Sequence, residues 1–187
     1  MRRIPIFATL VVLLAVATMV SLGFWQLRRL HEKEALLASY SQARGDSAEI
    51  KWPRERQKQL ELLYHRAHLT CVKVTGHSSI AGRSASDELG MAQTAQCTTP
   101  DGGNALVVIG WAEQPNAGMG WQGGEVHGRI APGPRLVADP PLAGLKAVAA
   151  PDPAEIPNNH LSYAFQWFFF AATALVIYAI ALRKRLR

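Results

Sequence analysis

The chain has 187 residues, a formal charge of +6 and two cysteines, and 49% of its residues are hydrophobic. The excess charge lies at the ends, with Arg2 and Arg3 before the first apolar run and four basic residues within 183–187. Between Ile4 and Leu182 the fourteen basic residues equal the fourteen acidic ones. This distribution leaves no basic surface for nucleic acid, so we expect no nucleic-acid partner. It indicates membrane topology instead.

The first apolar run covers residues 4–22 without a charged side chain, and Trp25 follows at interfacial depth. A small-x-small sequence at 15–17 leaves open a cleaved signal peptide. We favour an uncleaved transmembrane helix over 4–25, because the apolar run continues beyond that sequence. Leucines at helical spacing predict that this helix extends to about residue 43.

The second apolar run, residues 163–182, also lacks charge and is long enough to cross about 30 Å of hydrocarbon. We expect a transmembrane helix over 161–182 and a basic cytoplasmic tail over 183–187. Segment 147–163 contains no Lys or Arg, so the tail sets the orientation. Both termini are then cytoplasmic, and 45–157 forms a periplasmic domain, or an intermembrane-space domain in an organelle. The expected location is the bacterial inner membrane, in contact with lipid.

Cys71 and Cys97 both fall in the exported segment. An oxidising compartment allows them to form a structural disulfide, worth about 3 kcal/mol on the chain-entropy estimate. Two buried free thiols are the alternative. Neither cysteine belongs to a Cys-x-x-Cys pair, which argues against thiol–disulfide exchange or copper relay.

Between the two apolar runs the sequence is typical of β structure. Residues 105–111 form the clearest strand, apolar on both faces and therefore central in the sheet. A short amphipathic helix is expected over 54–64. The weaker predicted strands are 69–75, ending at Gly76, then 90–97, 125–130 and 135–138. The predicted fold is thus two transmembrane α-helices flanking a β-rich soluble domain, an antiparallel sheet or small barrel of the α+β type.

No motif indicates catalysis. A Gly-x-Ser-x-Gly elbow and a complete nucleophile set are missing from the sequence, and the glycine-rich stretch 118–124 lacks the context of a phosphate-binding loop. We therefore predict that the protein is not an enzyme. A membrane-anchored enzyme would need a compact set of titratable residues in the soluble domain.

Three segments together resemble the surfeit locus protein 1 family, assembly factors of cytochrome c oxidase. They are Leu-Gly-Phe-Trp-Gln-Leu-Arg-Arg at 22–29, Val-Val-Ile-Gly-Trp at 107–111 and Asn-Asn-His-Leu-Ser-Tyr-Ala at 158–164. The resemblance implies a role in haem a insertion or haem-site maturation in the catalytic subunit of the oxidase, in concert with other assembly factors. A membrane scaffold that stabilises an assembly intermediate without binding haem is the alternative.

His160 is the last ligand-capable group before the second apolar run. Its ring can ligate iron, and the resemblance implies that it holds haem a transiently. A single axial histidine suits a site that must release its haem. The alternative is a helix-start residue that hydrogen-bonds near Asn158 or Asn159.

Four residues at the outer end of the first span are expected on the same side of the membrane as His160: Trp25, Gln26, Arg28 and Arg29. With Tyr163 they complete the candidate haem-binding set. The two arginines suit the haem propionates, although snorkelling interfacial anchors are an equal alternative.

Gln166 is a polar residue inside the second span. An amide facing lipid would lose its hydrogen bonds, so we expect it to face the first helix or a partner subunit.

Overall fold

The computed structural model describes residues 5–186. Arg2, Arg3 and Arg187, which contributed to the charge argument, lie outside the described residues. The chain divides into two compact units. The helix unit consists of the described parts of Met1–Leu37 and Ile156–Arg187, and the β unit is Ala38–Glu155.

Two helices dominate the helix unit. Helix α1 (Ile6–Gly45) begins directly after Pro5, continues beyond Leu37 into the β unit, and ends near the predicted position 43. Helix α3 (His160–Leu186) follows the asparagine pair. Among the described residues, these two helical segments are long and apolar enough to cross a membrane. This agrees with the predicted fold class.

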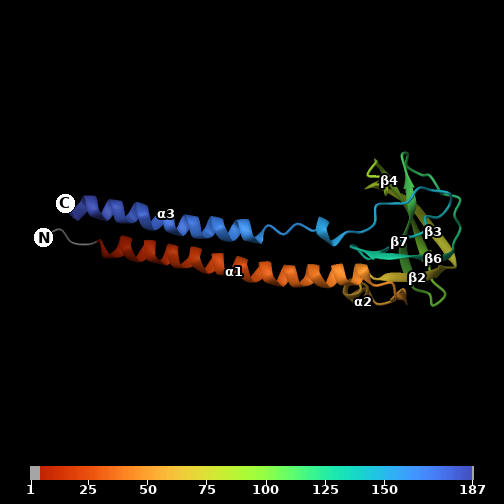
Figure 1. Ribbon diagram of the computed structural model, residues 1–187, viewed down its shortest axis with the longest axis horizontal. Coiled ribbons are helices and arrows are strands. Elements are labelled where there is room, and N and C mark those ends of the chain that lie inside the picture. Colours follow the sequence, from red (N-terminus) through yellow and green to blue (C-terminus); the bar gives the residue numbers. More distant parts are fainter. Residues whose placement is uncertain (1–4, 187) are drawn as a thin grey trace. The chain divides into compact units, whose positions relative to one another are not determined.

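Within the helix unit, α1 and α3 lie side by side and antiparallel (Figure 1). Gly23 is buried, and a Cβ built there would come within 2.5 Å of the Phe168 ring. The Phe24 and Phe168 rings contact edge to face, with centroids 5.4 Å apart. Small residues of α3, Ala164 and Ala171, are buried as well. Since apolar surface gains little by leaving lipid, this close packing is the main attraction between such helices.

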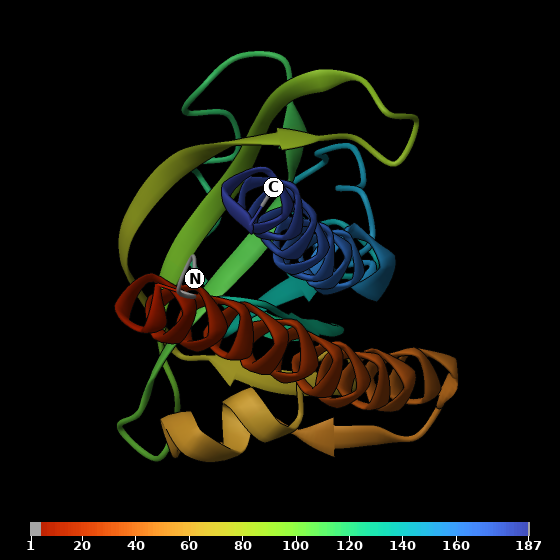
Figure 2. The ribbon, with the colours of Figure 1, turned by 90° about the vertical axis from the view of Figure 1, so that its left-hand side faces the viewer.

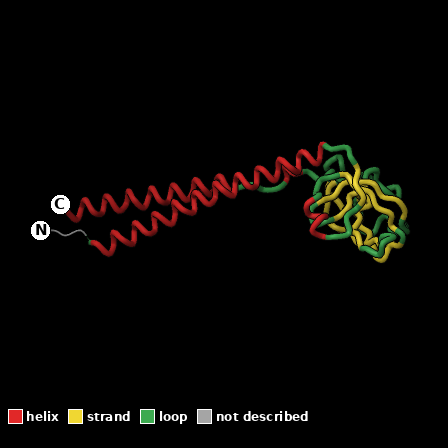
Figure 3. The backbone as a smooth tube through the Cα atoms, turned by 90° about the horizontal axis from the view of Figure 1, so that it is seen from below, coloured by secondary structure: helices red, strands yellow, loops and turns green. Residues whose placement is uncertain are grey.

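The β unit holds one mixed sheet, seen as the yellow strands of Figure 3. Within residues 5–186 it has seven strands in the order β1-β2-β6-β7-β5-β4-β3. Their bounds are β1 Glu49–Lys51, β2 Arg66–Cys71, β3 Lys73–Arg83, β4 Leu89–Thr98, β5 Asn104–Ala112, β6 Gly124–Ala131 and β7 Arg135–Ala138. The predicted β-rich domain is confirmed.

Two pairings differ from the predicted antiparallel sheet. β1 pairs with β2 in parallel, and β7 pairs with β5 in parallel. The β6–β7 pair is antiparallel, and β7 lies between β6 and β5. Strand β7 folds back from β6 and lies beside β5, and in this place it runs parallel to β5.

Strand β5 lies inside the sheet, which confirms the prediction for 105–111. It is buried on both faces. The core side chains with 1% exposure or less include Val107, Ile109, Trp111, Val126, Ile130 and Leu136.

The predicted strand 69–75 is wrong as a single element. The chain leaves β2 at Cys71 and starts β3 at Lys73, because β2 pairs with β6 while β3 pairs with β4. Gly76 does not end the strand but follows a register shift within β3.

Cys71, the last residue of β2, forms a disulfide with Cys97 of β4. The bond links segments 26 residues apart in sequence. Strand β1, which pairs with β2 at one edge of the sheet, leads into the short helix α2 (Arg56–Glu61), orange and gold in Figure 2.

Candidate functional site

The helix unit brings one pair of predicted site residues together. His160 is the first residue of α3, and its Nδ1 lies 2.8 Å from Oε1 of Gln26 in α1. With the proton on Nδ1, the imidazole donates to the Gln26 amide oxygen. That tautomer leaves a lone pair on Nε2, for which no described residue supplies a hydrogen bond. A neutral histidine held by its other nitrogen is the usual form of a metal ligand.

The local sequence explains why His160 is available. Among the described residues no bond to Asn159 Oδ1 caps the helix; its backbone oxygen accepts from Ser162 Oγ at 2.8 Å and from the Tyr163 amide at 3.2 Å. The hydrogen bonds at the start of α3 therefore do not involve the imidazole of His160. Asn158 Oδ1 is buried and has no hydrogen-bond partner among the described residues.

The aromatic candidates are solvent-facing in the isolated chain. Trp25 is 47% exposed and Tyr163 is 50% exposed. Trp25 is one helical step, about 100°, from Gln26, and Tyr163 is about one turn beyond His160. Both rings offer exposed apolar surface within about one helical turn of Gln26 or His160, and their amphipathic character equally suits the membrane interface.

The two arginines are placed less favourably. Arg29 is exposed, and its Nη1 lies 2.7 Å from the Glu32 carboxylate on the same helix. Arg28 is two residues from Gln26, which is about 200° around the helix. The structure thus unites Gln26 with His160, and within the described residues neither arginine makes a hydrogen bond to that pair.

Gln166 is exposed, whereas Ala164 is 1% exposed and packs in the helix unit. The amide therefore does not face α1, which excludes the first of the two predicted orientations. The amide lies on the exposed surface of α3, and a partner helix could cover this surface.

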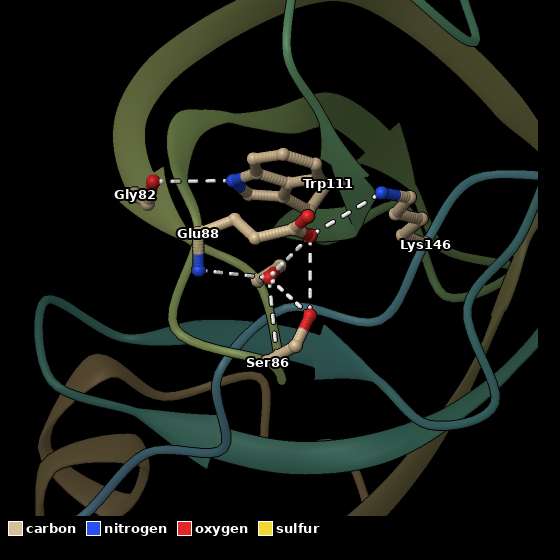
Figure 4. Close-up of polar contacts among 6 residues, drawn as sticks. Gly82, Ser86, Glu88, Trp111 and Lys146 are labelled. Carbon is tan, nitrogen blue, oxygen red and sulfur yellow. Dashed lines mark hydrogen bonds and ion pairs between the residues drawn. The ribbon is translucent and has the colours of Figure 1, made fainter.

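The β unit contains a polar cluster of different character (Figure 4). Glu88 Oε2 accepts from Ser84 Oγ and Ser86 Oγ, each at 3.1 Å, and from Lys146 Nζ at 3.2 Å. The bond from Lys146, followed by those from the serines, holds the pKa of Glu88 below its ordinary value. Lys146 Nζ also lies 5.2 Å from the centroid of the Trp111 ring.

This cluster connects the β3–β4 region to the segment that leads toward α3. Ser84 bridges to Val148, and the Ala85 amide donates to the Ala147 oxygen at 2.9 Å. Ser84 is 2% exposed and its hydroxyl is already bonded, so it is not placed as a nucleophile. Within residues 5–186, no group of three or more His, Cys, Asp or Glu side chains is arranged to hold a metal ion.

Sequence reasoning selected Gln26 and His160 separately but did not predict their contact. The available signal was that each polar residue borders an apolar run on the same side of the membrane. A sequence model of the SURF1 family matches residues 13–172, a range that contains both residues. No curated protein is significantly similar to the chain in sequence.

Proposed function

Because the chain belongs to the SURF1 family of cytochrome c oxidase assembly factors, we propose that it assists haem a insertion into the catalytic subunit of the oxidase. The observation that carries this proposal is the 2.8 Å contact between His160 Nδ1 and Gln26 Oε1. With the proton on Nδ1 donated to the Gln26 oxygen, Nε2 keeps a lone pair that could take an iron ligand position.

The residues around His160 fit a haem held for a short time. His160 would be the axial ligand, and Trp25 and Tyr163 would contact the apolar macrocycle. Haem a supplies redox chemistry in the finished oxidase, whereas this chain needs only to hold and release it. One protein ligand suits release, since a second axial histidine would strengthen retention.

Arg28 and Arg29 remain the proposed partners of the haem propionates. Arg29 would exchange its exposed bond with Glu32 for a propionate, a small cost because exposed ion pairs are weak. Arg28 would have to reach around α1. We therefore rank Arg29 above Arg28.

The proposed orientation places both termini in the cytoplasm and the β unit in the periplasm. Arg183, Lys184 and Arg185 support it, because positive charge next to a span favours the cytoplasmic side. The Cys71–Cys97 disulfide supports an oxidising compartment for the β unit.

The proposed role involves no catalysis by this chain. Its partners would be the oxidase catalytic subunit, other assembly factors and membrane lipid. One observation favours the alternative of a scaffold that does not bind haem: the exposed amide of Gln166 would gain a hydrogen bond from a partner helix.

The test is a reduced-minus-oxidised spectrum of membranes from a strain that lacks the gene and carries a plasmid copy. We expect wild type and His31→Ala to restore the haem a signal and His160→Ala to fail. His31 is a matched control, an exposed histidine of α1 whose Nδ1 lies 2.7 Å from the Leu27 oxygen. Gln26→Leu should restore the signal partly.

Other outcomes would redirect the proposal. Full restoration by His160→Ala together with loss in Gln166→Leu would favour the scaffold. An unchanged haem a signal after deletion, in a strain with no second copy, would contradict the role in assembly.

A further inference from the structure

Three arginines converge in the β unit, apart from the His160 site. Arg44 lies in the last turn of α1, Arg66 lies on β2 and Arg129 lies on β6. Arg66 and Arg129 are directly opposite in the antiparallel β2–β6 pair, so both side chains project from the same sheet face. Arg129 Nη1 reaches the Ala43 oxygen, at 3.5 Å, which brings it beside Arg44.

Their charges are only partly balanced. Arg44 Nη1 lies 2.7 Å from the Asp152 carboxylate, while Arg66 Nη1 lies 3.7 Å from Asp139, whose side chain is 73% exposed. Arg129 makes no ion pair among the described residues. Its bonded partners are backbone oxygens, and the stronger bond is to Tyr64 at 2.5 Å. Three cations therefore face two carboxylates.

Like charges directly opposite one another on paired strands are unfavourable. Burial lowers the pKa of Arg129, the charges of Arg66 and Arg44 lower it further, and Asp139 offsets part of this effect. A structural role accounts for some of the arrangement, because arginines commonly bond the carbonyls at a helix C-terminus. It does not account for Arg66 opposite Arg129.

The donor atoms point to the missing partner. Nε and Nη2 of Arg129 have no hydrogen-bond acceptor among the described residues, and neither atom is buried. Guanidinium groups bind oxyanions through paired N–H donors. A phosphate group offers several oxygens and up to two negative charges, enough to contact more than one guanidinium at once.

We propose that Arg44, Arg66 and Arg129 form a binding site for a phosphate oxyanion. The phosphate can belong to a phospholipid headgroup or to a soluble compound, and both present the same chemistry to the arginines. Occupancy would neutralise the Arg66–Arg129 pair and stabilise the junction of α1 with β2 and β6.

The test uses the full chain with its helices in detergent micelles. Inorganic phosphate is titrated at constant ionic strength and binding is measured by calorimetry. Arg66→Gln is the main variant, because its 3.7 Å ion pair with the exposed Asp139 carboxylate contributes little to folding. Arg83→Gln is the matched control: it also removes one positive charge from the β unit, at an exposed arginine paired with Asp87 at 2.6 Å.

A second arm reconstitutes the same proteins into vesicles of phosphatidylcholine alone or with phosphatidylglycerol, and compares thermal unfolding midpoints. The proposal predicts saturable phosphate binding with a Kd at least tenfold weaker in Arg66→Gln than in Arg83→Gln, or stabilisation by phosphatidylglycerol that Arg66→Gln loses. The first result identifies a soluble ligand and the second a lipid headgroup. Equal behaviour of the two variants in both arms, or no effect of either probe on wild type, would overturn the site.

Discussion

The helix unit and the β unit use polar side chains in opposite ways. In the β unit the Glu88 cluster supports the fold, because one carboxylate accepts three side-chain bonds from two segments of the chain. In the helix unit the polar contacts between α1 and α3 side chains, within the described residues, are Thr9 with Tyr178 and Gln26 with His160. Polar groups in lipid are costly, so those retained there are the better candidates for function.

The difference also concerns what holds each unit together. The β unit has an apolar core and a disulfide, and the helix unit depends on close packing around Gly23. Substitutions in the first should therefore affect stability, while substitutions in the second should affect helix packing and haem handling.

The largest expected effect is in the core of the β unit. Trp111→Ala removes a side chain that is 1% exposed and donates from Nε1 to the Gly82 oxygen at 3.2 Å. We expect a loss of about 3–5 kcal/mol in the free energy of unfolding, measured by denaturant titration with near-UV circular dichroism. Trp25→Ala, at an exposed position of the helix unit, should leave this transition unchanged. Equal losses would show that the two units are not independently stabilised.

The second-largest expected effect concerns the disulfide between Cys71 and Cys97. The double variant Cys71→Ala, Cys97→Ala should lower the free energy of unfolding of the β unit by about 3 kcal/mol, because the unfolded chain regains the entropy of an open loop. A reductant should destabilise wild type to the same extent and have no effect on the double variant. Insensitivity of wild type to reductant would contradict a stabilising bond.

Packing of the helix pair should respond to Gly23→Leu. The new Cβ would lie 2.5 Å from the Phe168 ring, and overpacking of this kind costs about 1–3 kcal/mol. Spin labels on cysteines placed at the exposed Leu14 and Ile177 should report a broader distance distribution by pulsed electron paramagnetic resonance. Gly45→Leu is the control, since nothing lies within 4 Å of a Cβ there. An unchanged distribution in Gly23→Leu would exclude this contact.

The smallest effect concerns pH. The pKa of Glu88 is lowered in the folded state, first by the bond from Lys146, so its contribution to stability is present above the unfolded carboxyl pKa of about 4.3 and is lost as pH falls below it. Thermal midpoints of Glu88→Gln should therefore fall less between pH 5 and pH 3 than those of wild type, as should those of Lys146→Gln. Superimposable pH profiles of wild type and Glu88→Gln would contradict a stabilising role of the ionised Glu88 carboxylate.

Local patterns in the sequence were sufficient for some elements. The uncharged runs predicted α1 and α3, and the apolar stretch 105–111 predicted an interior strand. These local patterns could not predict which strands pair with one another over long sequence distances. The parallel β5–β7 pairing depends on where β7 inserts, and the break at Val72 depends on β2 and β3 pairing with different strands.

The candidate site shows the same division. Residue type and position selected His160 and Gln26, because each borders an apolar run. Their contact could not be predicted, since it depends on the relative rotation of two helices. Likewise, the sequence around Arg66 and Arg129 does not indicate that the two residues meet, and only the β2–β6 register places them opposite each other.

The most direct test of the central claim is the absorption spectrum of the purified full chain after co-expression with haem a synthesis. The account predicts a Soret band and reduced α-band of bound haem a in wild type and in His31→Ala. It predicts loss of these bands in His160→Ala and a shifted Soret band in Gln26→Leu, whose imidazole has lost the acceptor that orients it. Haem a bound by His160→Ala with the wild-type spectrum and stoichiometry would contradict His160 as the axial ligand.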